Sequence, residues 1–272
     1  MKPTKKVALL HDICAVGKAG AMNMIPILNT MGLEVCLIPT MLLSTHTGGY
    51  GKPAIYPVSP DYLRQCARHY KEEKVTFDFI FVGYLGSCDM VEGVLDFIRQ
   101  FPKAKVVTDT IMGDNGKFYR NFDTRYLQAI RRLLPFSDLI LPNYTEACFL
   151  AEMEYKQNPN WTYQKAVGEK LSKFGAKDIV ITSVVAAEKT GIFYKKDEEK
   201  NCLFFDCEPN SMHGTGDIFD GVILGNYMRG VPLKENITQA HKFVKTCIAE
   251  TYQYAYDKRE GIVLEKMLPL LA

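Results

Sequence analysis

Short apolar runs and longer amphipathic stretches alternate along almost the whole chain. The apolar runs are rich in β-branched residues and end at turn residues, which is typical of strands. We expect strands at residues 5–10, 34–39, 78–83, 105–109, 138–141 and 178–183. Several of them are apolar at nearly every position, as strands buried on both faces of a parallel sheet are.

The stretches between the strands have helical spacing, which predicts helices near 19–31, 60–73, 89–101, 123–134, 162–174, 217–229 and 234–256. Ser59 before Pro60 is an N-cap signal, and Thr162 could cap the helix that should end near Gly175. No linker, repeat or low-complexity segment interrupts the alternation. The sequence therefore predicts one α/β domain over residues 1–272, with a mostly parallel sheet covered by helices on each side.

Two segments depart from this alternation. Residues 40–58 are rich in Gly, Thr and Pro, and residues 191–208 have the pattern of a β-hairpin whose turn carries Lys195 to Lys200. We expect both to be functional insertions at the sheet edges. Because open α/β sheets bind ligands beyond the carboxyl ends of their strands, the loops that follow strands are the candidates for chemistry.

The composition is that of a folded globular protein: 272 residues, 47% of them hydrophobic and 24% charged. The 33 Lys and Arg against 31 Asp and Glu leave a net charge of +2, too small for a polyanion-binding surface, so we expect no nucleic-acid partner. No apolar run approaches the roughly 18 residues that span a bilayer. The run Val7–Leu10 is too short for a signal peptide. We therefore expect a cytoplasmic protein with no membrane partner.

The strongest local signal is the segment His213–Asp217 (HGTGD), directly before an amphipathic run. Two glycines let backbone N–H groups turn toward one point, and the helix that begins there adds the positive end of its dipole. These features predict an anion site formed by Gly214, Thr215 and Gly216. Asp217 at its rim could take a proton from a hydroxyl that attacks the anion, or it could simply cap the helix.

Two further polar clusters follow predicted strands. Asp109 and Asp114 flank a Gly-containing turn, a combination that suits a hydrated magnesium ion or nucleotide phosphates, although an ordinary turn would explain residues 114–116 equally well. Asn143 and Glu146 lie three positions apart at a helix start and could face one ligand. Glu at that position is also a common capping residue.

The widespread nucleotide-binding motifs are absent from the sequence. The Gly-Lys pairs at Gly17, Gly51 and Gly116 are not followed by Ser or Thr, and no G-x-G-x-x-G occurs. Walker-type and Rossmann-type nucleotide binding therefore both lose support.

Taken together, the motifs resemble those of the ribokinase superfamily, and within it the pyridoxal kinase branch. The segments that carry the resemblance are Ser44–Gly48 (STHTG), Gly83–Ser87 (GYLGS), Asp109–Lys117 (DTIMGDNGK), Pro142–Ala147 (PNYTEA) and Gly214–Asp217 (GTGD). The last of these is shared with sugar and nucleoside kinases, whereas the combination with the first two points to vitamin B6. The resemblance implies a ribokinase-like three-layer α/β/α sandwich.

The resemblance also implies a reaction, in which the γ-phosphoryl of ATP moves to the 5′-hydroxyl of a B6 vitamer. Asp217 resembles the catalytic base, and the backbone of Gly214 to Gly216 the group that stabilises charge on the phosphoryl. The other implied positions are Glu146 and Asp109 for the metal, Asp114, Asn143, Thr182 and Ser183 for ATP, and Asp12, His46, Thr47 and Tyr84 for the substrate. Residues 204–212 resemble a segment near adenine. Implied cofactors are ATP and Mg²⁺, with K⁺ a candidate, and the implied assembly is a homodimer.

Departures from the family pattern concern the substrate. Thr110 stands where the family usually has Pro, and His11-Asp12 where many pyridoxal kinases have Gln-Ser. Asp12 could pair with a protonated ring nitrogen or amine, select an aminopyrimidine, or be a turn residue that caps the helix near 19–31. Three other functions stay open: a hydroxymethylpyrimidine kinase, a sugar or nucleoside kinase, and a non-catalytic B6-binding module.

Overall fold

The computed structural model describes residues 3–186, 189–206 and 212–272. Within these ranges the main sheet consists of β1 (Lys6–Val16), β2 (Glu34–Thr45), β3 (Ile55–Pro57), β4 (Phe79–Val82), β5 (Lys105–Thr108), β8 (Leu139–Ile140), β9 (Asp178–Ala186), β10 (Lys189–Lys196) and β11 (Glu199–Asp206). Their spatial order is β11-β10-β9-β8-β5-β4-β1-β2-β3. Neighbours from β9 to β2 pair in parallel, and β3, β10 and β11 add antiparallel pairs at the edges. This confirms the predicted, mostly parallel sheet.

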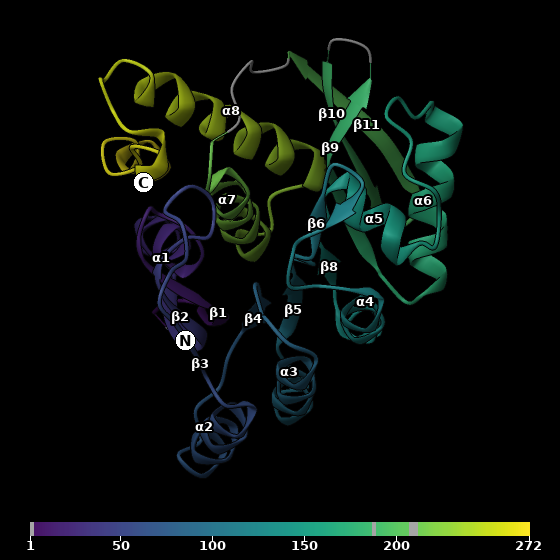
Figure 1. Cartoon of the computed structure of the whole chain (residues 1–272). Helices are drawn as coiled ribbons and strands as arrows, with labels where there is room; N and C mark the ends of the chain where they lie inside the picture. Colours follow the sequence, from purple (N-terminus) through teal and green to yellow (C-terminus); the bar gives the residue numbers. More distant parts are fainter. Residues whose placement is uncertain (1–2, 187–188, 207–211) are drawn as a thin grey trace.

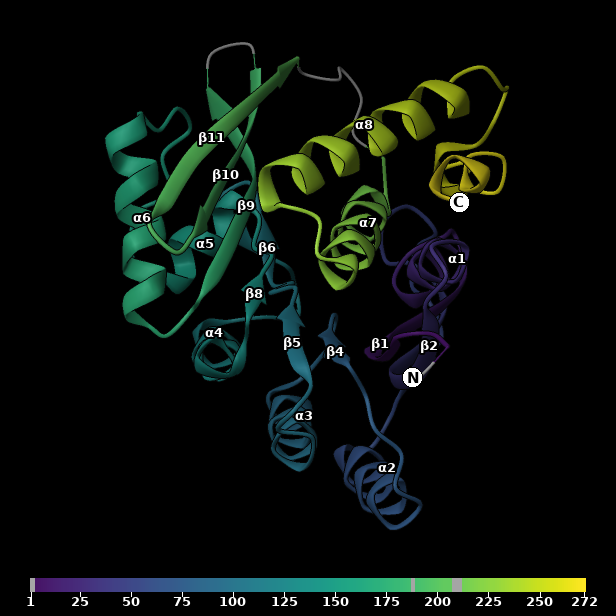
Figure 2. The ribbon, with the colours of Figure 1, turned by 180° about the vertical axis from the view of Figure 1, so that it is seen from behind.

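Helices cover both faces of the sheet (Figure 1). They are α1 (Ala21–Thr30), α2 (Pro60–Glu72), α3 (Cys88–Gln100), α4 (Thr124–Arg131), α5 (Tyr144–Leu150), α6 (Trp161–Lys173), α7 (Thr215–Arg229) and α8 (Leu233–Thr251). One apolar cluster packs α2 to α6 against the sheet, and a second packs α1, α7 and α8 against the opposite face (Figure 2). In β1, Ala8 and Leu10 belong to the first cluster and Val7 and Leu9 to the second, as the alternation of strand side chains requires. The predicted three-layer α/β/α architecture is therefore confirmed.

The first strand is longer than the sequence predicted. It continues to Val16, so His11 and Asp12 lie within it and not in a loop, and its register with β2 shifts between His11 and Ile13. The irregular pairing lets the strand carry polar residues into the interior. Asp12 as a turn residue that caps the next helix is wrong, because Gly20 is the N-cap of α1 and no side chain caps that helix.

The predicted edge segments and helix caps agree with the structure in part. β2 continues to Thr45, so the insertion expected at 40–58 begins inside a strand and also contains β3. The hairpin is confirmed as β10 and β11, with residues 207–208 of that prediction outside the described ranges. Ser59 caps α2 as predicted, whereas the cap of α6 is Asn160 and not Thr162. The Asn160 side chain accepts the N–H of Tyr163, and Thr162 falls inside the first turn.

Among the described residues, no helix is both long enough and apolar enough to cross a membrane.

Candidate active site

A cavity of about 440 Å³ opens where the carboxyl ends of β5 and β8 and the middle of β9 meet the start of α7. Residues of the motifs that follow β5 and β8, and of the motif at the start of α7, contribute to its wall. The predicted site residues that line it are Asp109, Asn143, Glu146, Thr182, Ser183, Gly214, Thr215, Gly216 and Asp217. Residues from distant parts of the sequence thus share one cavity because parallel strands end at the same edge of the sheet.

The start of α7 forms the concave anion loop of this cavity. Gly214 is the N-cap in the left-handed conformation, with φ of 82°, and no side chain caps the helix. A Cβ on Gly214 would lie 2.4 Å from the Lys18 carbonyl oxygen, so only glycine fits there. At Gly216, by contrast, a Cβ would meet nothing within 4 Å. The N–H groups of the first turn have no partner within the helix, and together with the dipole they suit an anion.

Asp217 lies in the first turn of α7, three residues after the N-cap. The alternative that Asp217 itself caps the helix is therefore wrong. Its Oδ2 accepts the backbone N–H of Gly20 at 2.8 Å, and its Oδ1 lies 3.5 Å from His11 Nε2. The carboxylate is thus held from the side of β1 and α1 while it lines the cavity.

A second acidic group, Asp109, lies against Asp220 of α7 at the cavity wall. Burial raises the pKa of Asp109 well above its usual range, and the Asp220 charge raises it further. The pKa of Asp220 is likewise raised, first by burial and then by the charges of Asp217 and Glu146. Sequence reasoning missed Asp220, although its place three residues after Asp217 on one helix face was a usable signal.

Glu146 is buried, with 2% of its surface exposed, and is held by several donors. Its Oε1 accepts the N–H of Met112 at 2.9 Å, and its Oε2 accepts the N–H of Asn143 at 3.0 Å and the hydroxyl of Thr110 at 3.2 Å. Burial raises the pKa of Glu146 to about 7 although these hydrogen bonds oppose the shift. The Thr that replaces the family's Pro thus contributes a donor to this carboxylate.

Asn143 and Glu146 form a reciprocal capping box at the start of α5. The capping interpretation of Glu146 is thereby confirmed, and it is compatible with a ligand-binding role because both side chains also line the cavity. The side-chain amide of Asn143 donates to the Gly113 carbonyl at 2.8 Å, which ties α5 to the loop after β5.

Strand β9 bends at the cavity wall. Ser183 has a φ of 60°, and the pairing of β9 with β10 is irregular between Gly191 and Phe193. Thr182 is anchored beside it, because its N–H donates to the Pro142 carbonyl at 3.0 Å. Left-handed non-glycine residues and bulges often mark places where a strand redirects side chains to a ligand.

The remaining predicted site residues lie outside the cavity wall. His46 accepts the N–H of Gly48 at its Nδ1 and contacts the Arg259 carbonyl with its Nε2 at 2.7 Å, so both ring nitrogens have backbone partners. Thr47 is exposed in the same loop. The hydroxyl of Tyr84 accepts a hydrogen bond from the side chain of Asn121.

Two carboxylates among these predicted residues differ sharply in exposure. Asp114 is exposed on the small hairpin of β6 (Gly113–Asp114) and β7 (Lys117–Phe118). Asp12 is only 7% exposed, and its Oδ1 contacts His11 Nδ1 at 2.7 Å. The charge of Asp12 therefore already has a partner in the protein.

The acidic residues of the cavity fit a hydrated magnesium ion. No group of three or more His, Cys, Asp or Glu in the described part of the chain is arranged to hold a metal by itself. Mg²⁺ does not require such a cage, because it usually keeps several waters and binds one or two carboxylates together with substrate phosphates. After burial, the charges of neighbouring carboxylates also raise the pKa of Asp109 and of Asp220, and a cation relieves that repulsion.

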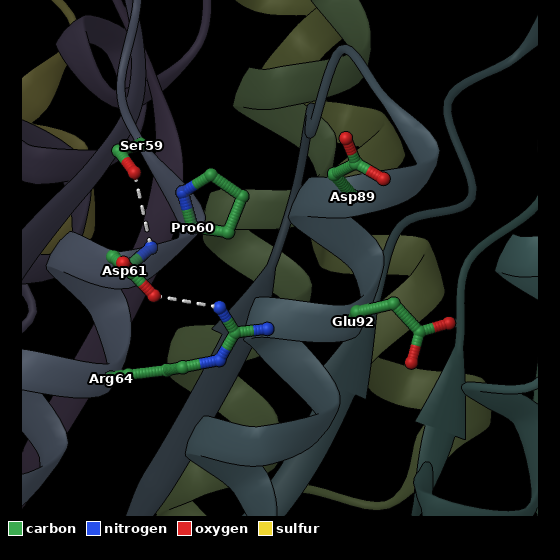
Figure 3. A pocket seen from close by; sticks show the side chains of 6 residues that line it. All are labelled: Ser59, Pro60, Asp61, Arg64, Asp89 and Glu92. Carbon is green, nitrogen blue, oxygen red and sulfur yellow. Dashed lines mark hydrogen bonds and ion pairs between the residues drawn. The ribbon is translucent and has the colours of Figure 1, made fainter.

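A second pocket lies between α2 and α3, lined by Ser59, Pro60, Asp61, Arg64, Asp89 and Glu92 (Figure 3). Arg64 is its only cationic lining residue, and its guanidinium is paired with Asp61 at 2.9 Å and with Asp96 at 2.8 Å. The pocket contains neither strand-end motifs nor a glycine loop, so we place no chemistry there.

The family model for phosphomethylpyrimidine kinase matches residues 16–263 of the chain. A Bacteroides thetaiotaomicron protein that carries the name phosphomethylpyrimidine kinase superposes with a TM-score of 0.94 at 35% identity, covering 99% of this chain and 94% of that one. A second crystal form of that protein contains pyridoxal.

Proteins named pyridoxal kinase are also similar to the chain. The structure from Lactobacillus plantarum has a TM-score of 0.91 at 32% identity and covers 98% of this chain and 96% of that one. A Schizosaccharomyces pombe relative of the same name is 24% identical over 100% of this chain and 92% of its own length. Another relative from that yeast is 24% identical over 71% of this chain, and the match spans 59% of the relative.

Proposed function

The chain belongs to the phosphomethylpyrimidine kinase family, and from this premise we propose that it transfers the γ-phosphoryl of ATP to the 5′-hydroxyl of a vitamin B6 vitamer. The observation that carries the proposal is the place of Asp217. It lines the same cavity as the anion loop of α7 and the acidic residues Asp109 and Glu146. Such a cavity provides the parts that in-line phosphoryl transfer needs: a base, an anion site and a place for a cation.

Asp217 accepts the proton of the substrate hydroxyl as that hydroxyl attacks the phosphoryl group. Each carboxylate oxygen has more than one acceptor site, so the bond from Gly20 leaves capacity for the substrate. The unpaired N–H groups at the start of α7 stabilise the charge that develops on the phosphoryl oxygens. Positioning and charge stabilisation therefore carry most of the catalysis.

Other residues of the same cavity would bind the nucleotide and its cation. Asp109 and Glu146 would hold a hydrated Mg²⁺, and Asn143, Thr182 and Ser183 would contact the phosphates. When bound, Mg²⁺ neutralises charge on the phosphates of ATP. Crowded carboxylates with raised pKa support this assignment, because a cation relieves their mutual repulsion.

The choice of B6 over an aminopyrimidine rests on the relatives named pyridoxal kinase and on the pyridoxal in the B. thetaiotaomicron structure. The pyrimidine alternative keeps one specific observation in its favour, the family model itself. Tyr84 and the loop that contains Thr47 are the proposed contacts of the substrate ring. Asp12 is less suited to pair with a substrate amine than its sequence suggests, because its carboxylate already contacts His11.

One assay separates the candidates. A single preparation is given ATP and Mg²⁺ with pyridoxal, pyridoxine, pyridoxamine or hydroxymethylpyrimidine, and ADP release is measured for each. We expect kcat/KM to be at least about tenfold higher for one B6 vitamer than for the pyrimidine, a difference of roughly 1.4 kcal/mol in transition-state stabilisation. A preference for the pyrimidine overturns the B6 assignment, and no turnover of any of the four overturns the kinase assignment.

A further inference from the structure

A buried imidazole connects two carboxylates beneath the cavity. His11 is only 1% exposed and stacks on Phe81, with an angle of 4° between the ring planes. Its Nδ1 contacts Asp12 Oδ1 at 2.7 Å, and its Nε2 faces Asp217 Oδ1 at 3.5 Å. Three polar side chains thus form a line from β1 to the start of α7.

The geometry indicates which ring nitrogens carry protons. An ionised carboxylate can only accept hydrogen bonds, so Nδ1 must donate to Asp12 and cannot also accept the nearby N–H of that residue. Nε2 faces a second carboxylate, and it has no hydrogen bond of normal length to any described residue. An imidazolium with both nitrogens protonated satisfies the two carboxylate contacts and leaves the Asp12 N–H, 2.9 Å from Nδ1, without an acceptor there. The longer of the two carboxylate contacts is of the kind that often shortens when a substrate binds.

Two glycines make room for this arrangement. A Cβ on Gly83 would lie 2.1 Å from the imidazole Cδ2 of His11, and a Cβ on Gly20 would lie 2.4 Å from Asp12 Oδ1. Gly20 also donates the N–H that binds Asp217 Oδ2. The backbone is therefore shaped around the ring and both carboxylates, which is not expected of an incidental buried histidine.

The charges that face His11 also favour the imidazolium. Burial alone lowers the pKa of His11, but the hydrogen-bonding and charge interactions with Asp12 and Asp217 outweigh it and raise the pKa to about 10. Cys14 on the same strand stays a neutral thiol, because burial and the charges of Asp12 and Asp217 raise its pKa to about 12. Phe81 of β4 and Gly83, which directly follows that strand, meet the ring and carry no charge.

We propose that His11 is a positioning residue for the base of the reaction: anchored by Asp12, its ring fixes the Asp217 carboxylate at the cavity. The assignment of Asp217 as the base rests on the proposed function. Asp12 serves in this arrangement as the anchor of His11. The departure from the family's Gln-Ser at these two positions is then a single paired change.

The kinetic test replaces His11→Gln, which removes the positive charge and retains a side chain that can donate one hydrogen bond. We expect kcat near pH 7 to fall about tenfold with the KM for ATP unchanged, because the base and not the nucleotide site is affected. His69→Gln, an exposed position on α2, makes the same chemical change as a control.

A merely structural role predicts a different result. If His11→Gln raises the KM for ATP together with the fall in kcat, or leaves kcat within about twofold of the unmodified enzyme, the positioning role is overturned. Phe81→Leu serves as a second comparison, because it loosens the packing under the His11 ring and retains the charge of that ring. We expect that variant to lower stability but to leave kcat per folded enzyme within about twofold.

A second measurement does not depend on turnover. In protein with ¹⁵N-labelled histidine, the signals of His11, assigned by their loss in His11→Gln, should show both ring nitrogens protonated at about pH 8. Asp217→Asn should lower the pH at which His11 titrates by about one unit or more. A neutral His11 at that pH overturns the proposed arrangement of Asp12, His11 and Asp217, even if the enzyme phosphorylates a B6 vitamer. If His11 is protonated but the protein phosphorylates none of the tested substrates, only the proposed function is wrong.

Discussion

The carboxylates that line the cavity are held in two different ways. Asp217 lies among donors, with the Gly20 N–H and the His11 ring beside it. Asp109 and Asp220 are instead buried against each other, and the pKa of each is raised. A carboxylate among donors is ready to accept a proton, whereas crowded carboxylates gain most from a cation or a shared proton. The difference shows that one cavity can separate a base from a cation site by local environment alone.

Asp217→Asn tests this difference most directly and has the largest expected effect. The amide cannot accept the proton of the attacking hydroxyl, so we expect kcat to fall by about 10²- to 10⁴-fold with little change in ATP binding. The two carboxylate oxygens face two donors, the Gly20 N–H and the His11 ring, whereas an amide has only one oxygen. One of these donors would then face the amide NH₂ group, so the stability of the fold should fall. Steady-state kinetics and thermal unfolding measure the two effects. Near-normal kcat contradicts the role of Asp217, and Asp89→Asn on the exposed start of α3 is the control.

The anion loop can be tested with a matched pair of substitutions. Gly214→Ala places a methyl group against the Lys18 carbonyl in a left-handed residue, so both stability and activity should fall. Gly216→Ala meets nothing within 4 Å, so the fold should be unaffected. If the phosphoryl group occupies that space, Gly216→Ala still lowers kcat/KM by about 10²-fold, the loss that a shift of about 1 Å in a reacting group can cause. A fully active Gly216→Ala enzyme contradicts the placement of the phosphate.

These two glycines show how far the sequence could lead. The loop itself was predictable, because its spacing before an amphipathic run is local information. Which glycine is sterically required was not, because the requirement arises from Lys18, nearly two hundred residues away. The comparisons confirm the family resemblance and the three-layer fold. Both could be predicted because, like the loop, they depend on strand-end motifs and apolar runs that are local in the sequence.

Most of the placements that sequence reasoning did not predict depend on long-range packing. His11 and Asp12 looked like a loop because polar residues interrupt an apolar run, yet the strand continues through them and buries them against α7. Asp220 lies in a run of apolar helix residues, and a role for its carboxylate becomes visible only when the fold brings it into contact with Asp109. The cap of α6 was misassigned within two residues, since Asn160 and Thr162 are both acceptable N-caps by type.

Asp109→Asn makes the same chemical change as Asp217→Asn at a carboxylate that contacts Asp220, and we expect the opposite effect on stability. The amide relieves repulsion with Asp220 and can still donate to it, so Tm should rise by about 2–4 °C, the equivalent of roughly 1 kcal/mol. Activity should nevertheless fall, with the Mg²⁺ concentration for half-maximal rate raised about tenfold, because one carboxylate for the hydrated cation is lost. Thermal unfolding and a Mg²⁺ titration of the rate, with EDTA as the metal-free reference, check both signs. A lowered Tm with an unchanged Mg²⁺ requirement contradicts the cation site.

The smallest expected effect distinguishes two roles of Asn143, capping of α5 and contact with the nucleotide. Asn143→Ala and Ser59→Ala each remove an N-cap side chain, so each should lower stability by about 1 kcal/mol. Asn143 also holds Glu146 in its capping box and donates to Gly113, whereas Ser59 lies on the far pocket between α2 and α3. Only Asn143→Ala should therefore lower kcat/KM for ATP, by about tenfold, when both are measured at equal folded fraction. Equal activity in the two variants means that Asn143 only caps α5, and the nucleotide then contacts this wall through Thr182 and Ser183.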